Sequence, residues 1–171
     1  MSDGNFRIRK LLPNDARAYR EIRLEALANN PEAFGSNFDS EAAEALAWFA
    51  NRLSESEVFG AVGEFELLGI AGFYVHQGSK RAHKATLWGM YVRPRARKIT
   101  VGRRLAEAVI DAARQHAELI QLSVVSENHA ARRLYSSLGF VEYGLEKNAL
   151  KQEGRYYDEV LMALPLAQDR R

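Results

Sequence analysis

The order of apolar and polar positions predicts a chain that alternates between β-strands and amphipathic helices. Short apolar or alternating segments predict strands over residues 6–11, 58–62, 67–75, 86–92, 119–125, 140–147 and 155–164. Apolar residues repeated at intervals of three and four predict helices over about residues 15–29, 40–53, 102–117 and 126–138.

The connections between these elements predict a mixed sheet. Short connections join the strands over residues 58–62, 67–75 and 86–92, which favours an antiparallel meander. A helix then links residues 86–92 to residues 119–125, an order that is typical of a parallel pair. We therefore expect an α/β fold whose sheet is mostly antiparallel with one parallel pair and is flanked by about four helices. A ligand site is expected where the connections change direction, at the carboxyl ends of the strands.

The strand over Thr86 to Val92 is the most informative segment. It is apolar, aromatic or β-branched except at Gly89, a composition that predicts a strand buried on both faces. Pro94 ends the pattern because proline has no N–H for a β-ladder. Gly89 marks either a bulge, a close approach of a ligand to the backbone, or a packing requirement against an aromatic side chain.

A basic loop connects this strand to a helix that starts near Gly102. The loop and the first helical turn carry Arg93, Arg95, Arg97, Lys98, Arg103 and Arg104. Cations are unfavourable at a helix N-terminus, which already has a partial positive charge, so this cluster indicates that an anion binds there. A phosphate-bearing ligand is the best candidate. The alternative is a solvated basic face.

Composition limits the classes of function. The chain has 171 residues, of which 47% are hydrophobic and 27% charged, so we expect one domain with a sizeable core. Its formal net charge is only +2, which argues against a general nucleic-acid binder. There is no cysteine, and the four histidines show no ligand spacing, so no metal is expected. No segment reads as a signal peptide or membrane span, which predicts a soluble, cytoplasmic protein.

The basic loop carries a recognisable motif. The pattern Val92-x-Pro94-x-x-Arg97-x-x-Thr100-x-Gly102 resembles the acetyl-coenzyme A (acetyl-CoA) loop of the GNAT acetyltransferase superfamily. Thr100 stands where that family usually has its first glycine, and Lys98 where another is common. Backbone N–H groups bind the phosphates in this family, and threonine still supplies one. The cofactor-binding residues that the resemblance implies are Met90, Tyr91, Val92, Arg97, Lys98, Thr100, Val101, Gly102, Arg103 and Asn128.

A second motif is more specific. Asn128-x-x-Ala131-x-x-Leu134-Tyr135-x-x-x-Gly139-Phe140 is similar to the segment that follows the fifth strand in GNAT proteins, and the two motifs with the element order cover nearly the whole chain. Taken alone, Asn128 is typical of a helix N-cap and Tyr135 of a core aromatic. The resemblance, to small bacterial members of the family, implies that Asn128 contacts the pantetheine arm and that Tyr135 is the general acid.

The resemblance implies acetyl transfer from acetyl-CoA to a primary amine of a small molecule or peptide. The amine attacks the thioester directly, and backbone N–H groups near Tyr91 and Val92 hold the developing oxyanion. A coenzyme A-binding protein without catalysis is the alternative, and nucleic-acid binding through Arg93 to Arg104 ranks below both. A homodimer is suggested by the family alone.

No general base is evident from the sequence. Ribosomal-protein N-acetyltransferases commonly carry a glutamate where this chain has Ser123. The acidic candidates are Glu21, Glu25, Asp158 and Glu159, each of which is more typical of a surface charge, and His83 is a weaker candidate. The acceptor amine is also left open by the sequence.

Overall fold

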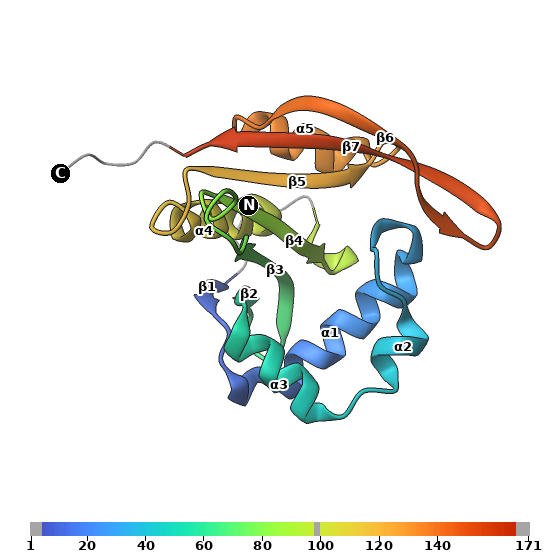
Figure 1. Ribbon diagram of the computed structural model, residues 1–171. Coiled ribbons are helices and arrows are strands. Elements are labelled where there is room, and N and C mark those ends of the chain that lie inside the picture. The colour runs from blue at the N-terminus through green and yellow to red at the C-terminus, as the bar shows by residue number, and fades with distance from the viewer. Residues whose placement is uncertain (1–4, 98–99, 167–171) are drawn as a thin grey trace.

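The computed structural model describes residues 5–97 and 100–166 and contains a seven-stranded sheet. The strands are β1 (Arg7–Lys10), β2 (Glu57–Val62), β3 (Leu67–Val75), β4 (Lys84–Val92), β5 (Leu119–Val125), β6 (Val141–Gln152) and β7 (Arg155–Pro165). Their order across the sheet is β1-β2-β3-β4-β5-β7-β6, and every neighbouring pair is antiparallel except β4 and β5. This confirms the expected mixed sheet with one parallel pair (Figure 1).

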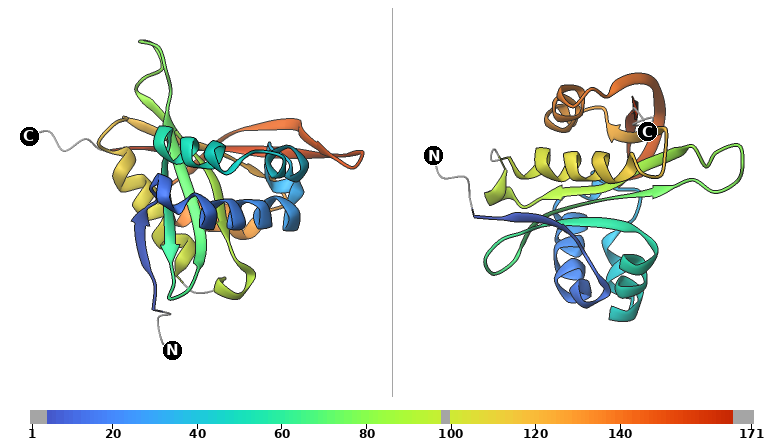
Figure 2. Two further views of the ribbon diagram at one scale, coloured as in Figure 1. Left: turned by 90° about the horizontal axis from the view of Figure 1, so that it is seen from below. Right: turned by 90° about the vertical axis from the view of Figure 1, so that its left-hand side faces the viewer.

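Helices cover both faces of the sheet (Figure 2). The described residues form α1 (Ala16–Asn29), α2 (Phe38–Ala42), α3 (Leu46–Glu55), α4 (Val101–Ala113) and α5 (His129–Ser137), with short 3-10 turns η1 (Pro13–Asp15), η2 (Pro31–Ala33) and η3 (Pro94–Ala96). Residues of α1 and α3 form one hydrophobic cluster with β2 and β3. Residues of α4 and α5 form a second cluster on the opposite face. None of the helices in the described part of the chain is both long and apolar enough to cross a bilayer.

The helix predicted over residues 40–53 is wrong, because the segment is divided into α2 and α3. Phe49 and Leu53 are buried as the apolar stripe predicted, but Leu46 is exposed. The division places the side chain of Glu41, on α2, inside the protein, where it is 3% exposed. The apolar periodicity did not reveal this buried carboxylate.

Glu41 is the centre of a buried ion cluster. It accepts hydrogen bonds from Nε and Nη2 of Arg23 on α1, both at 2.9 Å, and Arg52 of α3 lies 3.3 Å from its carboxylate. The guanidinium of Arg52 also stacks on Trp48 at 4.0 Å from the ring centroid. Burial by itself raises the pKa of Glu41, but the bonds from Arg23 and the charges of both arginines outweigh burial and lower the pKa. The cluster therefore ties α1, α2 and α3 together.

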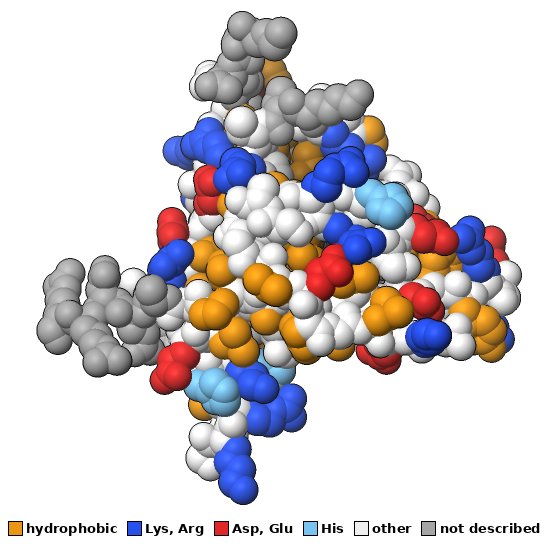
Figure 3. Space-filling view, turned by 90° about the horizontal axis from the view of Figure 1, so that it is seen from above, with side chains coloured by type: hydrophobic (Ala, Val, Ile, Leu, Met, Phe, Trp, Pro, Cys, Tyr) orange, Lys and Arg blue, Asp and Glu red, His pale blue; other side chains and the backbone are white. Residues whose placement is uncertain are grey.

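β6 is an edge strand that pairs only with β7. It carries the exposed apolar residues Val141, Tyr143 and Leu145. Figure 3 shows hydrophobic side chains gathered on the face of the molecule seen from above. The edge of β6 therefore combines open backbone groups with apolar side chains.

We predict that Glu41→Gln lowers the free energy of unfolding by about 3–5 kcal/mol at neutral pH, because it leaves two partly desolvated arginines without their counter-charge. Glu44→Gln, an exposed change of the same kind, is the control. The pKa of Glu41 is lower in the folded protein than in the unfolded chain, where it is about 4.3. The difference in the free energy of unfolding between wild type and Glu41→Gln is therefore complete above the unfolded pKa, and it shrinks as the pH falls through the folded pKa. Urea denaturation at several pH values measures both effects, and equal midpoints for the two variants would contradict the prediction.

Candidate active site

The parallel strands β4 and β5 separate soon after they pair. Their register covers only Lys84 with Leu119, Ala85 with Ile120, and Thr86 with Gln121. β4 then continues to Val92 and β5 to Val125, but the two strands no longer pair with each other. We predicted that the strand over residues 86–92 is buried on both faces. Only Leu87 and Tyr91 are buried in this segment, and its other residues are half-buried. The edge of β4 that faces β5 is left open to a ligand.

Gly89 explains the separation. It has a φ of +66°, and the register between β3 and β4 shifts at this point, so that two residues of β4 lie opposite one of β3. This is the bulge that the sequence allowed, and such a bulge bends the strand. A Cβ at Gly89 would meet no atom nearer than Nη1 of Arg23, at 3.7 Å, so packing is not the reason for glycine. Glycine is needed for its left-handed backbone.

The N-terminus of α4 lies at the end of β4. Thr100 is its N-cap and makes no side-chain capping bond, and Val101 is the first helical residue, one position before the predicted start. The first backbone bond of the helix runs from the Arg104 N–H to the Thr100 carbonyl, so the preceding N–H groups have no intrahelical acceptor. A Cβ at Gly102 would lie 3.5 Å from Leu134 of α5 and 3.6 Å from Val92. The two sequence motifs therefore meet at this helix start.

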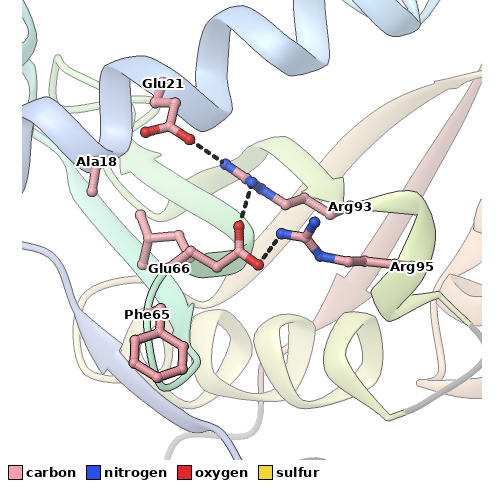
Figure 4. Close-up of a pocket in the computed structure, with 7 residues that line it drawn as sticks. Ala18, Glu21, Phe65, Glu66, Arg93 and Arg95 are labelled. Carbon is pink, nitrogen blue, oxygen red and sulfur yellow. Dashed lines mark hydrogen bonds and ion pairs between the residues drawn. The ribbon is translucent and has the colours of Figure 1, made fainter.

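Two arginines of the basic loop are neutralised within the protein. Arg93 is buried and forms ion pairs with Glu21 at 3.1 Å and Glu25 at 3.4 Å, and its Nη1 lies 2.5 Å from Glu66. Arg95 also binds Glu66. Figure 4 shows Glu21, Glu66, Arg93 and Arg95 around a cavity of about 450 Å³. For Arg93 and Arg95, the negative charge that was expected from a ligand therefore comes from carboxylates of α1 and of the β2–β3 turn.

The remaining arginines of the loop differ in their partners. Arg97 donates from Nε to the Val92 carbonyl at 2.9 Å and makes no ion pair with a carboxylate of the described residues. Arg103 binds Glu107 at 3.1 Å and the Ser137 hydroxyl at 3.1 Å. Arg104 stacks on Phe6. Lys98 lies outside the described residues. Arg97 and Arg104 are therefore the described arginines of this segment whose charge no described carboxylate neutralises.

Tyr91 and Arg93 hold two of the acidic candidates in place. The Tyr91 hydroxyl donates a hydrogen bond to Glu25 at 3.0 Å and accepts one from the Asn29 amide at 3.2 Å. Burial is the main reason that the pKa of Tyr91 is raised. Glu25 is thus held by Tyr91 and Arg93, and Glu21 by Arg93. These contacts, which join residues more than 60 positions apart, gave no signal in the sequence.

The second motif forms α5 and its two ends. The side-chain oxygen of Asn128 accepts a hydrogen bond from the Ala131 N–H at 3.2 Å, so the N-cap interpretation is confirmed. Gly139, with a φ of +97°, ends the helix as predicted. Tyr135 is buried and packs edge-on against Phe140 at 5.7 Å, and burial raises its pKa above the ordinary range of a phenol. The hydroxyl is therefore protonated at neutral pH.

The last two acidic candidates lie on β7. Asp158 accepts a hydrogen bond from the Asn148 N–H at 2.8 Å. Glu159 is half-buried beside Ser123, and its pKa is raised, mainly by burial and further by the charge of Glu146, while the Ser123 hydroxyl lowers it. Within residues 5–97 and 100–166, no three His, Asp or Glu side chains gather as a metal site would require.

The sequence and the fold both match known proteins. The model of the acetyltransferase (GNAT) family matches residues 19–140. The ribosomal protein bS18-alanine N-acetyltransferase of Salmonella typhimurium is 34% identical over 85 residues, which are 49% of this chain and 57% of that relative. The chain thus spans little more than half the length of this curated relative.

Two solved structures share the fold over almost their whole length. A GNAT-family acetyltransferase from Streptococcus pneumoniae has a TM-score of 0.85 at 21% identity, covering 95% of this chain and 100% of that chain. A putative acetyltransferase from Salmonella typhimurium, solved with its cofactor acetyl-CoA, has a TM-score of 0.79 at 24% identity, covering 97% and 96%. Because the family model matches most of the sequence and the solved relatives share its sheet, this chain belongs to the GNAT family of acetyltransferases.

Proposed function

We propose that this protein transfers an acetyl group from acetyl-CoA to a primary amine of a peptide or small molecule. The observation that carries the proposal is the position of the open α4 N-terminus, which lies against both the end of β4 and Leu134 of α5. One ligand at this point can reach the unpaired edge of β4 and the helix that carries Tyr135. Family membership supports acetyl-CoA as that ligand.

The residues present fit the pyrophosphate of acetyl-CoA. The N–H groups of Val101, Gly102 and Arg103 have no intrahelical acceptor, and the helix start carries the positive end of the dipole. Arg97 adds a charge that no described carboxylate neutralises. Thr100 contributes its backbone N–H, and Lys98 lies outside the described residues.

The same geometry supports the rest of the proposed cofactor site. The backbone edge of Met90, Tyr91 and Val92 has no partner strand toward β5, although the Val92 carbonyl accepts a hydrogen bond from Arg97, and its remaining groups suit the amides of the pantetheine arm. Asn128 uses its oxygen to cap α5, which leaves its NH₂ group for a ligand carbonyl. Acetyl-CoA supplies the thioester on which the chemistry takes place.

Proton transfer to the leaving sulfur is the role we assign to Tyr135. The neutral amine forms a C–N bond with the acetyl carbonyl carbon while the C–S bond breaks, and the phenol gives its proton to the sulfur. The nitrogen then loses one proton to water and the phenolate takes one back from solvent, which leaves a neutral amide and a free thiol. The backbone N–H groups near Tyr91 and Val92 stabilise the developing oxyanion. Because burial raises the pKa of Tyr135, the proton stays on the phenol until negative charge develops on the sulfur.

We expect Tyr135→Phe to lower kcat by about 100-fold or more while the Kd for acetyl-CoA changes little, because phenylalanine preserves the packing against Phe140 and removes only the proton donor. Tyr143→Phe, an exposed tyrosine on β6, is the control. Thiol release measures kcat and calorimetry measures Kd. An unchanged kcat would remove Tyr135 from the mechanism.

We expect Gly102→Glu to weaken acetyl-CoA binding by about tenfold or more, equivalent to roughly 1.4 kcal/mol, because a carboxylate then faces the bound phosphates. An acidic residue in the first helical turn stabilises the helix, so unfolding would not explain the loss. Gly102→Ala, whose Cβ meets only ordinary contacts, is the control for steric effects. Calorimetric titration measures the affinities, and undiminished binding by Gly102→Glu would place the phosphates elsewhere.

An acetylation assay with a panel of amines tests the function itself. Release of thiol with at least one peptide or small-molecule amine is expected. Tight binding of acetyl-CoA with no release under any amine would favour the alternative, a coenzyme A-binding protein, for which the departures at Lys98 and Thr100 from the usual glycines are the supporting observation.

A further inference from the structure

The carboxylate of Glu159 lies on the sheet face opposite α5. Directly paired residues of antiparallel strands share a face, and Glu159 of β7 pairs with Val125 of β5 and with Glu146 of β6. The alternate residues Val124, Val160 and Met162 belong to the hydrophobic cluster that contains Tyr135. Glu159 and Tyr135 therefore approach β5 from its two opposite faces.

Glu159 is also close to the place where the sheet opens. Its neighbour Ser123 lies two residues beyond Gln121, the last residue of β5 that pairs with β4. Ser123 is exposed, and Leu161 of β7 is its direct partner across the strands. The Ser123 hydroxyl donates a hydrogen bond to the Glu159 carboxylate from a position on β5 that has no partner on β4.

The other acidic candidates are already occupied. Glu21 and Glu25 bind Arg93, Glu25 also accepts from Tyr91, and Asp158 accepts a backbone N–H. Glu159 forms no ion pair with any cation among the described residues, although it is half-buried. The charged group that faces it is acidic, because Glu146 lies directly opposite on β6 and raises the pKa of Glu159. This carboxylate is therefore suited to accept a proton.

We propose that Glu159 is the general base of the reaction, with Ser123 as the residue that positions it toward the gap between β4 and β5. The inference rests on the proposed acetyl transfer. An N–H bond of the acceptor ammonium breaks, and its proton moves to the carboxylate, directly or through one water. The freed electron pair of the nitrogen then forms the C–N bond while the C–S bond breaks and Tyr135 protonates the departing sulfur. The nitrogen loses its second proton to water, which leaves a neutral amide, and the Tyr135 phenolate takes a proton back from solvent. Glu159 finally returns its proton to solvent.

The same arrangement indicates a class of acceptor. The carboxylates of Glu146 and Glu159 are directly opposite each other and repel, and a cation between them relieves the repulsion. The acceptor is therefore an amine that arrives as an ammonium, with no carboxylate next to its nitrogen. An α-ammonium, with a pKa near 8, passes its proton to a carboxylate more easily than a lysine ammonium near 10.4.

The test is the pH dependence of kcat/KM for wild type and variants with an amine that turns over. We expect Glu159→Gln to lower kcat/KM at pH 7 by about 100-fold and to keep the Kd for acetyl-CoA. In the wild type, kcat/KM falls at low pH as Glu159 becomes protonated, and this acidic limb of the pH profile should be absent in Glu159→Gln. Glu118→Gln makes the same charge change at the opposite, exposed end of β5 and should behave as wild type.

Two further variants shift the limb in opposite directions. Because the charge of Glu146 raises the pKa of Glu159, Glu146→Gln should move the acidic limb to lower pH. Because the Ser123 hydroxyl lowers that pKa, Ser123→Ala should move the limb to higher pH. A merely structural role for Glu159 predicts neither shift, and thermal unfolding confirms that each variant folds.

The outcomes separate the two proposals. An active wild type with a Glu159→Gln variant of equal rate and equal pH profile would overturn the role of Glu159 and leave acetyl transfer intact. A wild type that binds acetyl-CoA and acetylates no amine would overturn acetyl transfer, and the general base with it.

Discussion

The site depends on one interruption in backbone hydrogen bonding, where β4 leaves β5 after three paired residues. A continuous parallel pair would satisfy every backbone group of β4 and leave nothing for a ligand to pair with. Gly89 makes the interruption possible because its left-handed φ lets the strand bulge and turn, a conformation that strains other residues by about 1–3 kcal/mol. The α4 N-terminus, α5 and β7 are all arranged around the opening that results.

Internal ion pairs decide how the charge of this opening is distributed. Glu66, in the β2–β3 turn, binds both Arg93 and Arg95, and Glu21 binds Arg93 from α1. The basic loop is thus attached to two neighbouring elements before any ligand arrives, which lowers the entropy lost on binding. Positive potential remains at the helix start and at Arg97, where a phosphate can approach the free N–H groups.

The sheet separates the two proton transfers of the proposed reaction. Tyr135 belongs to the cluster on the α5 face, and Glu159 lies on the opposite face. Burial raises both pKa values, with opposite consequences. The phenol keeps its proton at neutral pH, whereas the carboxylate becomes a stronger base. A reacting carbonyl in the gap between the strands can then receive an amine from one face and lose a thiolate toward the other.

Local sequence patterns predicted much of this architecture. The seven strands, the parallel pair and the helix start beside Gly102 followed from periodicity and from the special residues glycine and proline, because these depend on near neighbours along the chain, and a bulge at Gly89 was one of the alternatives that the sequence left open. The cap at Asn128 and the left-handed Gly139 are local in the same sense.

Only the tertiary structure decided which charges meet. Arg23 and Glu41 are 18 positions apart, and Tyr91 and Glu25 are 66 apart, so no sequence window contains either pair. Glu41 is buried on α2, in a segment that the apolar pattern predicted as a single helix and that the structure divides into α2 and α3. Glu159 had the same appearance in the sequence as Glu21 and Glu25, and it differs because the fold brings arginines to those two and brings Ser123 and Glu146 to it. The energy of a charge depends on its solvation and on its neighbours in space, which the order of residues along the chain does not specify.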